Sequence, residues 1–135
     1  MRRVGDKTMM RRELLAIVAL CFCTTLFAQE PAAKTVQLTI DYGDGSQKTF
    51  TAIEWKEKQT VFDVLQAAEK HPRGIKLKHR GSGAALFVSA IDEVANQSGG
   101  NAWLYEVNGT PGDRSCAIYD VQASDKLLWK FGKNR

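Results

Sequence analysis

Apolar and polar residues alternate in two stretches near the end of the chain, at 102–107 and 126–131. Such alternation is typical of a β-strand that buries one face. An Asn-Gly pair, which is a turn signal, directly follows the first stretch. We therefore predict two strands whose aromatic residues face a common core. The alternating apolar residues are Trp103, Tyr105, Val107, Leu127, Trp129 and Phe131.

The same alternation opens the folded part of the chain. Residues 36–42 alternate strictly, 43–46 read Gly-Asp-Gly-Ser, and 48–55 are rich in β-forming residues. Glycine adopts the positive φ angles of tight turns without steric cost, so the two stretches predict a hairpin. Phe50 is out of phase with the apolar residues that follow it, which indicates a β-bulge in the second strand.

One helix is predicted after the hairpin, where the apolar period changes to that of an amphipathic helix. Thr60 and Asp63 form a variant capping box, because the hydroxyl can accept from an amide of the first turn and the carboxylate complements the helix dipole. Residues 71–74, His-Pro-Arg-Gly, end the helix. A helix of about three turns therefore packs one face on the core. That face consists of Val61, Val64, Leu65 and Ala68.

A further alternating stretch at 75–80 leads into Gly-Ser-Gly at 81–83, which we expect to be a mobile loop. The neighbourhood carries four cations and His79, and such a cluster would suit an anion site. Cationic residues on a solvated edge strand explain the same composition without a ligand, and we favour that interpretation. The four cationic residues are Arg73, Lys76, Lys78 and Arg80.

Strands are also predicted at 86–91 and 116–121, with a polar connection at 92–101. The order is therefore strand, strand, helix and then several strands, without an internal repeat. This order favours an α+β fold of the β-grasp type, in which the helix packs on one face of a single mixed sheet.

The chain opens with a basic segment and an apolar run at 14–27. A basic head, a short apolar middle and a small residue before the cleavage point are the features of a secretory signal peptide. The run is also shorter than the about 20 residues that a membrane-spanning helix needs. We predict a cleaved signal peptide at 1–28, a flexible spacer at 29–35 and a β-grasp-like domain at 36–135. The candidate start residues are Met1, Met9 and Met10.

The leader sets both the location and the charge that we expect. The protein is predicted to be secreted or periplasmic, with no membrane anchor after cleavage. Of 19 Lys and Arg and 15 Asp and Glu residues, five and two lie in residues 1–28, which leaves 14 and 13 and a net charge of +1. Proteins that bind nucleic acids need a basic surface, so we do not expect that function.

Cys116 is the one cysteine beyond the leader. We expect it to be a buried thiol, with an intermolecular disulfide as the alternative.

The sequence carries no recognisable catalytic or metal-binding motif. It has no His-Glu-x-x-His helix, Cys-x-x-Cys pair, nucleophile elbow or phosphate-binding glycine loop. A small serine hydrolase would use Ser82 or Ser89 with His79 as the base, but it would also need an orienting acid and an oxyanion site. We therefore expect no enzyme, no catalytic residue and no metal.

Three short motifs lie near the C-terminus: Trp103-x-Tyr105-x-Val107-Asn108-Gly109, Ala117-x-Tyr119-x-Val121 and Asp125-x-x-x-Trp129-x-Phe131. Together they resemble the signature of the transcobalamin C-terminal-like domain, a small β-grasp-like domain of largely unassigned function in bacterial secreted and surface proteins. In vitamin B12 carriers the equivalent domain closes over cobalamin. The resemblance therefore implies a ligand-capping role, with cobalamin as a candidate ligand.

These features predict an exported, non-catalytic module that binds a small molecule or a cell-envelope component. The alternative is a protein-interaction module that pairs through an edge strand such as 75–79. We expect the binding surface on the loops 92–101 and 108–115, although a core needs the same aromatic residues. The candidate ligand-binding residues are Trp103, Tyr105, Asn108, Gly109, Tyr119 and Trp129.

Overall fold

The structure is a computed structural model that describes residues 33–133. The predicted signal peptide and residues 29–32 of the predicted spacer lie outside the described residues. The part described contains one α-helix and two β-sheets, of which the larger is mixed. The predicted α+β class, with a mixed sheet of the β-grasp type and one packed helix, is therefore confirmed.

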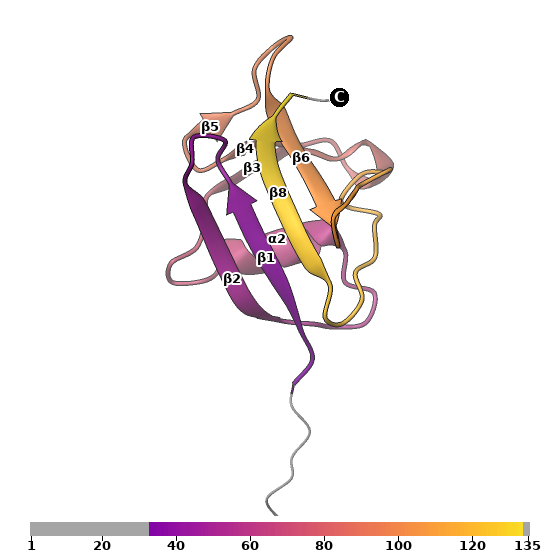
Figure 1. The fold of residues 1–135 in the computed structure, drawn as a ribbon. Helices are drawn as coiled ribbons and strands as arrows, with labels where there is room; N and C mark the ends of the chain where they lie inside the picture. Colours follow the sequence, from indigo (N-terminus) through magenta and orange to yellow (C-terminus); the bar gives the residue numbers. More distant parts are fainter. Residues whose placement is uncertain (1–32, 134–135) are drawn as a thin grey trace, which may run out of the picture. The chain divides into compact units, whose positions relative to one another are not determined.

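The larger sheet consists of β1 (Thr35–Asp41), β2 (Gln47–Glu54), β6 (Ala102–Val107), β7 (Thr110–Pro111) and β8 (Lys126–Gly132). Their order across the sheet is β2-β1-β8-β6-β7 (Figure 1). β1 pairs in parallel with β8, and the other neighbours are antiparallel. Trp103 lies opposite Phe131, and Tyr105 lies opposite Trp129. The two predicted aromatic stripes are thus adjacent in the sheet.

The hairpin of β1 and β2 carries the predicted bulge. Val36 pairs with Ile53 and Leu38 with Phe50, so β2 has one more residue than β1 between these two pairs. An extra residue changes the face to which the following side chains point. It thereby places Phe50 on the buried side of the sheet, where only 7% of its surface is exposed.

The helix α2 (Val61–Glu69) packs on the inner face of the larger sheet and passes behind β1 and β8 in Figure 1. Its N-terminus is the predicted capping box: the Asp63 N–H donates to Thr60 Oγ1 over 3.2 Å, and the Thr60 N–H donates to Asp63 Oδ2 over 2.9 Å. The predicted apolar face is fully buried. Its residues Val61, Val64, Leu65 and Ala68 are each 0% exposed.

The predicted strand at 116–121 is wrong, because this segment forms turns with a single bridging residue. Its carbonyl groups instead accept hydrogen bonds from the start of α2. The Val61 N–H donates to the Tyr119 carbonyl over 2.9 Å, and the Phe62 N–H donates to the Cys116 carbonyl over 3.0 Å. The first amides of a helix have no partner inside it, and this segment supplies acceptors for two of them. The apolar pattern that suggested a strand comes from two buried residues, Cys116 and Val121.

The prediction of a single sheet is wrong, because the described residues form a second, smaller sheet beside the larger one. The smaller sheet contains β3 (Leu77–Arg80), β4 (Phe87–Ile91) and β5 (Val94–Ala95) in that order. β3 is an edge strand, as predicted, and its three charged or polar residues are exposed. The predicted loop at 81–83 leads into a short 3₁₀ helix, Gly83–Ala85. The polar connection at 92–101 contains β5, so this part of the prediction is also corrected.

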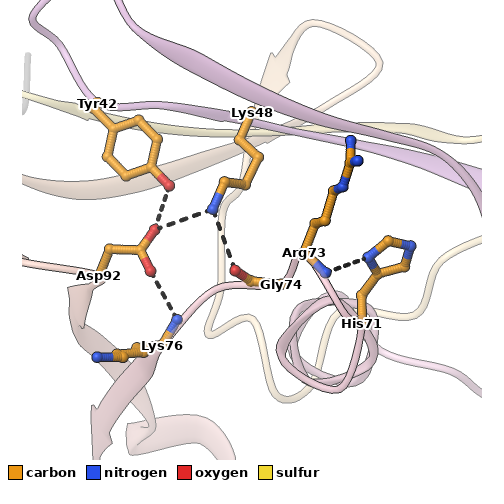
Figure 2. Close-up of polar contacts among 7 residues, drawn as sticks. All are labelled: Tyr42, Lys48, His71, Arg73, Gly74, Lys76 and Asp92. Carbon is orange, nitrogen blue, oxygen red and sulfur yellow. Dashed lines mark hydrogen bonds and ion pairs between the residues drawn. The ribbon is translucent and has the colours of Figure 1, made fainter.

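A polar network joins the two sheets (Figure 2). Asp92, which follows β4, accepts hydrogen bonds from the Tyr42 hydroxyl and from the Lys76 N–H, the latter over 2.9 Å. Lys48 Nζ lies 3.9 Å from Asp92 Oδ2 and donates to the Gly74 carbonyl over 3.2 Å. Burial, together with the hydrogen bond to Asp92, raises the pKa of Tyr42. The network therefore connects the β1–β2 hairpin to the start of β3.

Candidate functional site

A cleft of about 360 Å³ lies between the free edge of β6, the start of β4 and the loop after β7. Its volume falls in the lower part of the range of small-molecule pockets, roughly 300–1,000 Å³. Four aromatic residues, Phe87, Trp103, Tyr105 and Trp129, contribute to its lining. The cleft is thus mainly apolar and large enough for a small organic molecule.

The cleft runs along the edge of β6 rather than over one of its faces. Successive side chains of a strand point to opposite faces, yet four consecutive residues, 103–106, line the cleft. β7 pairs with this edge only at Glu106 and Val107. Residues from both faces of β6 therefore contribute to the cleft wall at this edge.

Polar contacts close both ends of this free edge. At one end the Asn96 side chain connects the two sheets: Nδ2 donates to the Val88 carbonyl over 3.0 Å, and Oδ1 accepts from the Trp103 N–H over 2.9 Å. At the other end the Gly112 N–H donates to the Tyr105 carbonyl over 3.0 Å. These contacts fix the length of edge that a ligand can reach.

Tyr105 forms the centre of the aromatic wall. Its ring centroid lies 5.3 Å from that of Trp129 and 5.9 Å from that of Tyr119, and its hydroxyl donates to the Arg114 carbonyl. Gly112 lies so close to the ring that a Cβ atom there would overlap it. Burial raises the pKa of Tyr105 to about 12. The hydroxyl therefore remains a neutral hydrogen-bond donor at pH 7.

Trp129 carries an unused hydrogen-bond donor beside the cleft. Its side chain is 2% exposed, and its indole N–H has no hydrogen-bond partner within residues 33–133. The other two indole groups are satisfied, since Trp103 Nε1 donates to the Val94 carbonyl over 2.8 Å and Trp55 Nε1 to the Val121 carbonyl over 3.0 Å. A buried donor without a partner costs about 1–3 kcal/mol. The nitrogen atom itself is buried, so this donor is not presented to a ligand in the cleft.

The charged residues that line the cleft are mostly cations. They are Arg114, Lys130 and Lys133, with Glu106 as the acidic residue. Lys130 Nζ lies 3.5 Å from Glu106 Oε2, and Arg114 Nε lies 2.8 Å from Asp113 Oδ1. Lys133 has no ion pair within the described part of the chain. The cleft therefore presents an excess of positive charge beside its apolar surface.

The predicted ligand-binding residues take three different places. Those that line the cleft are Trp103, Tyr105 and Trp129. Tyr119 packs edge-on against Tyr105 but does not line the cleft. Asn108 and Gly109 form the two-residue turn between β6 and β7, with φ angles of 51° and 81°. The Asn108 side chain donates to Asp125 Oδ1 over 2.9 Å, so it stabilises this turn.

Several cleft residues were not singled out from the sequence, among them Phe87, Arg114 and Lys133. Phe87 is 51% exposed. The sequence could have indicated this exposed aromatic residue, because it alternates with the buried positions of the strand 86–91. Of the predicted binding loops, 108–115 supplies part of the lining, whereas 92–101 supplies Asn96 at one end.

Outside the cleft, residues 33–133 include His79, the base of the serine hydrolase alternative. The ring of His79 packs edge-on against Phe62, with centroids 4.9 Å apart. In the same residues, no group of three or more His, Cys, Asp and Glu side chains is arranged to hold a metal ion. The helix in this part of the chain is too short and too polar to span a membrane.

One family model matches the sequence. It is described as a domain of unknown function (DUF4430) and matches residues 58–133. The matched segment begins just before α2 and includes every residue that lines the cleft. No curated protein matches the sequence.

Two crystal structures show a similar fold. A protein from Ruminococcus gnavus, described as "a putative metal binding protein", is 16% identical with a TM-score of 0.61, and the match covers 76% of this chain and 99% of that chain. Haptocorrin in complex with Cbi is 14% identical with a TM-score of 0.59, and the match covers 79% of this chain and 27% of haptocorrin. At such identities the similarity establishes the fold alone.

Proposed function

Because the chain belongs to the DUF4430 family of domains of unknown function, we propose a function from its site rather than from its family. The protein is an exported, non-catalytic module that binds a small organic molecule or an envelope component in the cleft along β6. The proposal rests on the cleft itself, which combines an aromatic wall with an excess of cationic residues.

The exposed ring of Phe87 supports a binding role. Large apolar side chains at the surface of a monomer often mark sites of interaction when they gather beside a concave surface. Phe87 is 51% exposed and lines the cleft together with the nearly buried Trp103. A ligand that covered Phe87 would remove this apolar surface from water, which favours binding.

The similarity to haptocorrin supports a ligand of the corrinoid type as the first to test. That protein was crystallised with Cbi, and this chain matches 27% of it. The resemblance of the C-terminal motifs to the transcobalamin C-terminal-like domain agrees with this choice. We do not extend metal binding to this chain, because its residues 33–133 lack a group of side chains suited to it.

Export is the second part of the proposal, and it rests on the predicted leader. Expression of the full chain in a bacterial host, followed by fractionation and N-terminal sequencing, tests it. We expect the protein in the exported fraction with Gln29 as its first residue. Recovery of the uncleaved chain from the cytoplasm would contradict export without affecting the cleft.

Ligand binding is tested by calorimetric titration of the full chain with Cbi, cobalamin and the aromatic anion 8-anilinonaphthalene-1-sulfonate. We expect saturable binding of at least one of them, weakened about tenfold by Phe87→Ala because an aromatic contact is lost. Ile118→Ala is the matched control, since Ile118 is also exposed, at 45%, but lies outside the cleft. Equal affinities of the two variants would contradict binding in the cleft.

A further inference from the structure

We infer that a second surface of the protein, separate from the cleft, binds an acidic polysaccharide. This surface, the basic strip, consists of five cationic residues at the end of α2, in the turn that follows and along β3: Lys70, Arg73, Lys76, Lys78 and Arg80. In Figure 1 the strip follows the chain from the end of α2 through β3, on the far side of the larger sheet. None of these five described residues lines the cleft, so the inference goes beyond the proposed function.

Charges are strongly segregated along the described chain. Residues 70–91 hold five Lys and Arg and no Asp or Glu. The rest of residues 33–133 holds eight Lys and Arg and twelve Asp and Glu, so a net charge of +5 in one segment stands against −4 in the remainder. Such an asymmetry within a nearly neutral domain favours an acidic partner for the positive segment.

The cations of the basic strip are not neutralised by the protein itself. All five residues are exposed, and none forms an ion pair within residues 33–133. The two carboxylates nearest in sequence bind the backbone instead: Glu69 Oε2 accepts from the Leu77 N–H over 3.2 Å, and Asp92 Oδ1 accepts from the Lys76 N–H over 2.9 Å. Figure 2 shows the Lys76 side chain turned away from the Asp92 carboxylate. This positive charge is therefore available to a partner.

The strand β3 sets the spacing of the cations at one end of the strip. Lys76, Lys78 and Arg80 alternate with residues that face inward. His79 is one of these, and its ring packs against Phe62 with centroids 4.9 Å apart. Alternate residues of a strand share a face, so the three cations follow one another on the outer face at intervals of roughly 7 Å. Such a row suits a polymer that carries negative charges at intervals along its chain.

Edge protection, the interpretation favoured from the sequence, explains only part of the strip. Charged side chains on an edge strand oppose pairing with another chain, and this accounts for Lys78 and Arg80. Lys70, Arg73 and Lys76 precede β3, so they do not protect its edge. An acidic ligand explains all five cations together.

The strip lacks the apolar surface that a protein or a membrane would need. Protein interfaces have an apolar centre, and segments that lie in a membrane surface insert apolar side chains. The exposed large apolar residues among residues 33–133 are Phe87, which lines the cleft, and Ile118. Neither belongs to the basic strip, so its partner is bound mainly through charge.

The strip also lacks exposed aromatic rings on which bases could stack. Proteins that bind single-stranded nucleic acids combine cations with such rings. The rings of His71 and His79 instead pack edge-on against Phe50 and Phe62, with centroids 5.4 Å and 4.9 Å apart. An acidic polysaccharide has neither bases nor large apolar groups, and it therefore fits the strip better than a nucleic acid.

The inference is tested by fluorescence-anisotropy titration of the full chain with end-labelled oligogalacturonate, in which every sugar unit carries a carboxylate. We expect saturable binding that weakens about tenfold or more between roughly 50 and 200 mM NaCl, because each neutralised charge adds to the salt dependence. The methyl-esterified oligomer has the same chain without the charges, and it should not bind measurably. Equal affinity for the two oligomers refutes the inference.

Two double variants with the same change in net charge locate the binding surface. Arg73→Glu with Lys78→Glu reverses two cations of the strip and should weaken binding about tenfold or more. Lys56→Glu with Lys126→Glu reverses two exposed cations outside it and should weaken binding less than about threefold. Equal losses would assign the binding to net charge alone and refute the strip. If circular dichroism shows that the first variant does not fold, Arg73→Gln with Lys78→Gln replaces it, with an expected loss of about fivefold.

Further probes identify the other possible outcomes. Vesicles of phosphatidylglycerol and an oligothymidylate, each at the same concentration of negative charge, should bind more weakly than oligogalacturonate. Equal or tighter binding of either would identify a membrane or a nucleic acid as the partner and refute the inference.

The cleft variant Phe87→Ala separates this inference from the proposed function. It should leave the binding of oligogalacturonate unchanged, because Phe87 lines the cleft and is not part of the basic strip. A tenfold loss, about that expected for a cleft ligand, would place the polymer in the cleft and refute the second surface while the proposed function stands. If oligogalacturonate does not bind at all, the inference fails and binding in the cleft is unaffected.

Discussion

Gly112→Ala tests whether Tyr105 is held in place by the close approach of the backbone after β7. A Cβ atom at position 112 would overlap the Tyr105 ring. Gly112 does not have a positive φ angle, so alanine brings no backbone strain and the effect is purely steric. The ring cannot retreat easily, because Trp129 and Tyr119 pack against it.

The expected magnitude follows from these contacts. Overpacking of a well-filled site costs about 1–3 kcal/mol. A shifted ring would also lose the hydrogen bond from its hydroxyl to the Arg114 carbonyl, which adds about 1 kcal/mol. We therefore expect Gly112→Ala to lower the free energy of unfolding by about 2–4 kcal/mol. The same shift should weaken ligand binding, because Tyr105 lines the cleft.

Urea unfolding followed by circular dichroism measures this change. Gly132→Ala is the matched control, since Gly132 also lacks a positive φ angle and has no atom within 4 Å of the added Cβ. That variant should stay within about 0.5 kcal/mol of the parent. In a Tyr105→Ala background the cost of Gly112→Ala should largely disappear, because the partner of the clash is gone. Equal unfolding midpoints for the Gly112 and Gly132 variants would refute the reasoning.

Three further predictions concern stability. Thr60→Ala should lower the free energy of unfolding by about 1 kcal/mol in urea titrations through loss of the helix cap, whereas Thr60→Ser should retain most of it. Tyr42→Phe should cost about 1 kcal/mol in the same assay, because Asp92 loses a donor; no change would show that the network of Figure 2 is not stabilising. Burial raises the pKa of Cys116 from 9.0 to about 11. Its neutral thiol is thus favoured in the folded protein, so this contribution is complete below pH 9 and is lost as pH rises toward 11. Cys116→Ala should reduce the slope of stability against pH in that window, and an unchanged slope would contradict the assignment.

The elements that could be predicted from the sequence are those fixed by neighbouring residues. The capping box needs only Thr60 and Asp63, three positions apart, and the structure forms both of its hydrogen bonds. The bulge in β2 was visible because Phe50 breaks an otherwise regular alternation. The aromatic stripes of β6 and β8 were predicted for the same reason, since alternation reports directly which side chains share a face.

The cleft could not be predicted in this way, because it depends on contacts between distant segments. Trp103, Tyr105 and Trp129 were identified as candidates, but sequence alone cannot distinguish a core residue from one that lines a cleft. Phe87 lines the same cleft because it is the first residue of β4, a strand of the smaller sheet that begins near the edge of β6. Asn96 connects these two strands through a side chain in a loop. Neither relation leaves a periodic signal in the sequence.

The wrongly predicted strand and the open edge of β6 have one cause. After Gly112 the chain leaves β6, and the carbonyls of Cys116 and Tyr119 then accept hydrogen bonds from the first amides of α2. Had residues 112–121 continued along β6 as a strand, they would have covered the cleft and left those helix amides without partners. Hydrogen bonds to the buried amides of a helix N-terminus stabilise the fold more than extra strand pairing at an edge in contact with water. The reason is that a buried amide without a partner lowers the free energy of unfolding. The cleft therefore exists because the segment that could have filled it is used to complete the helix.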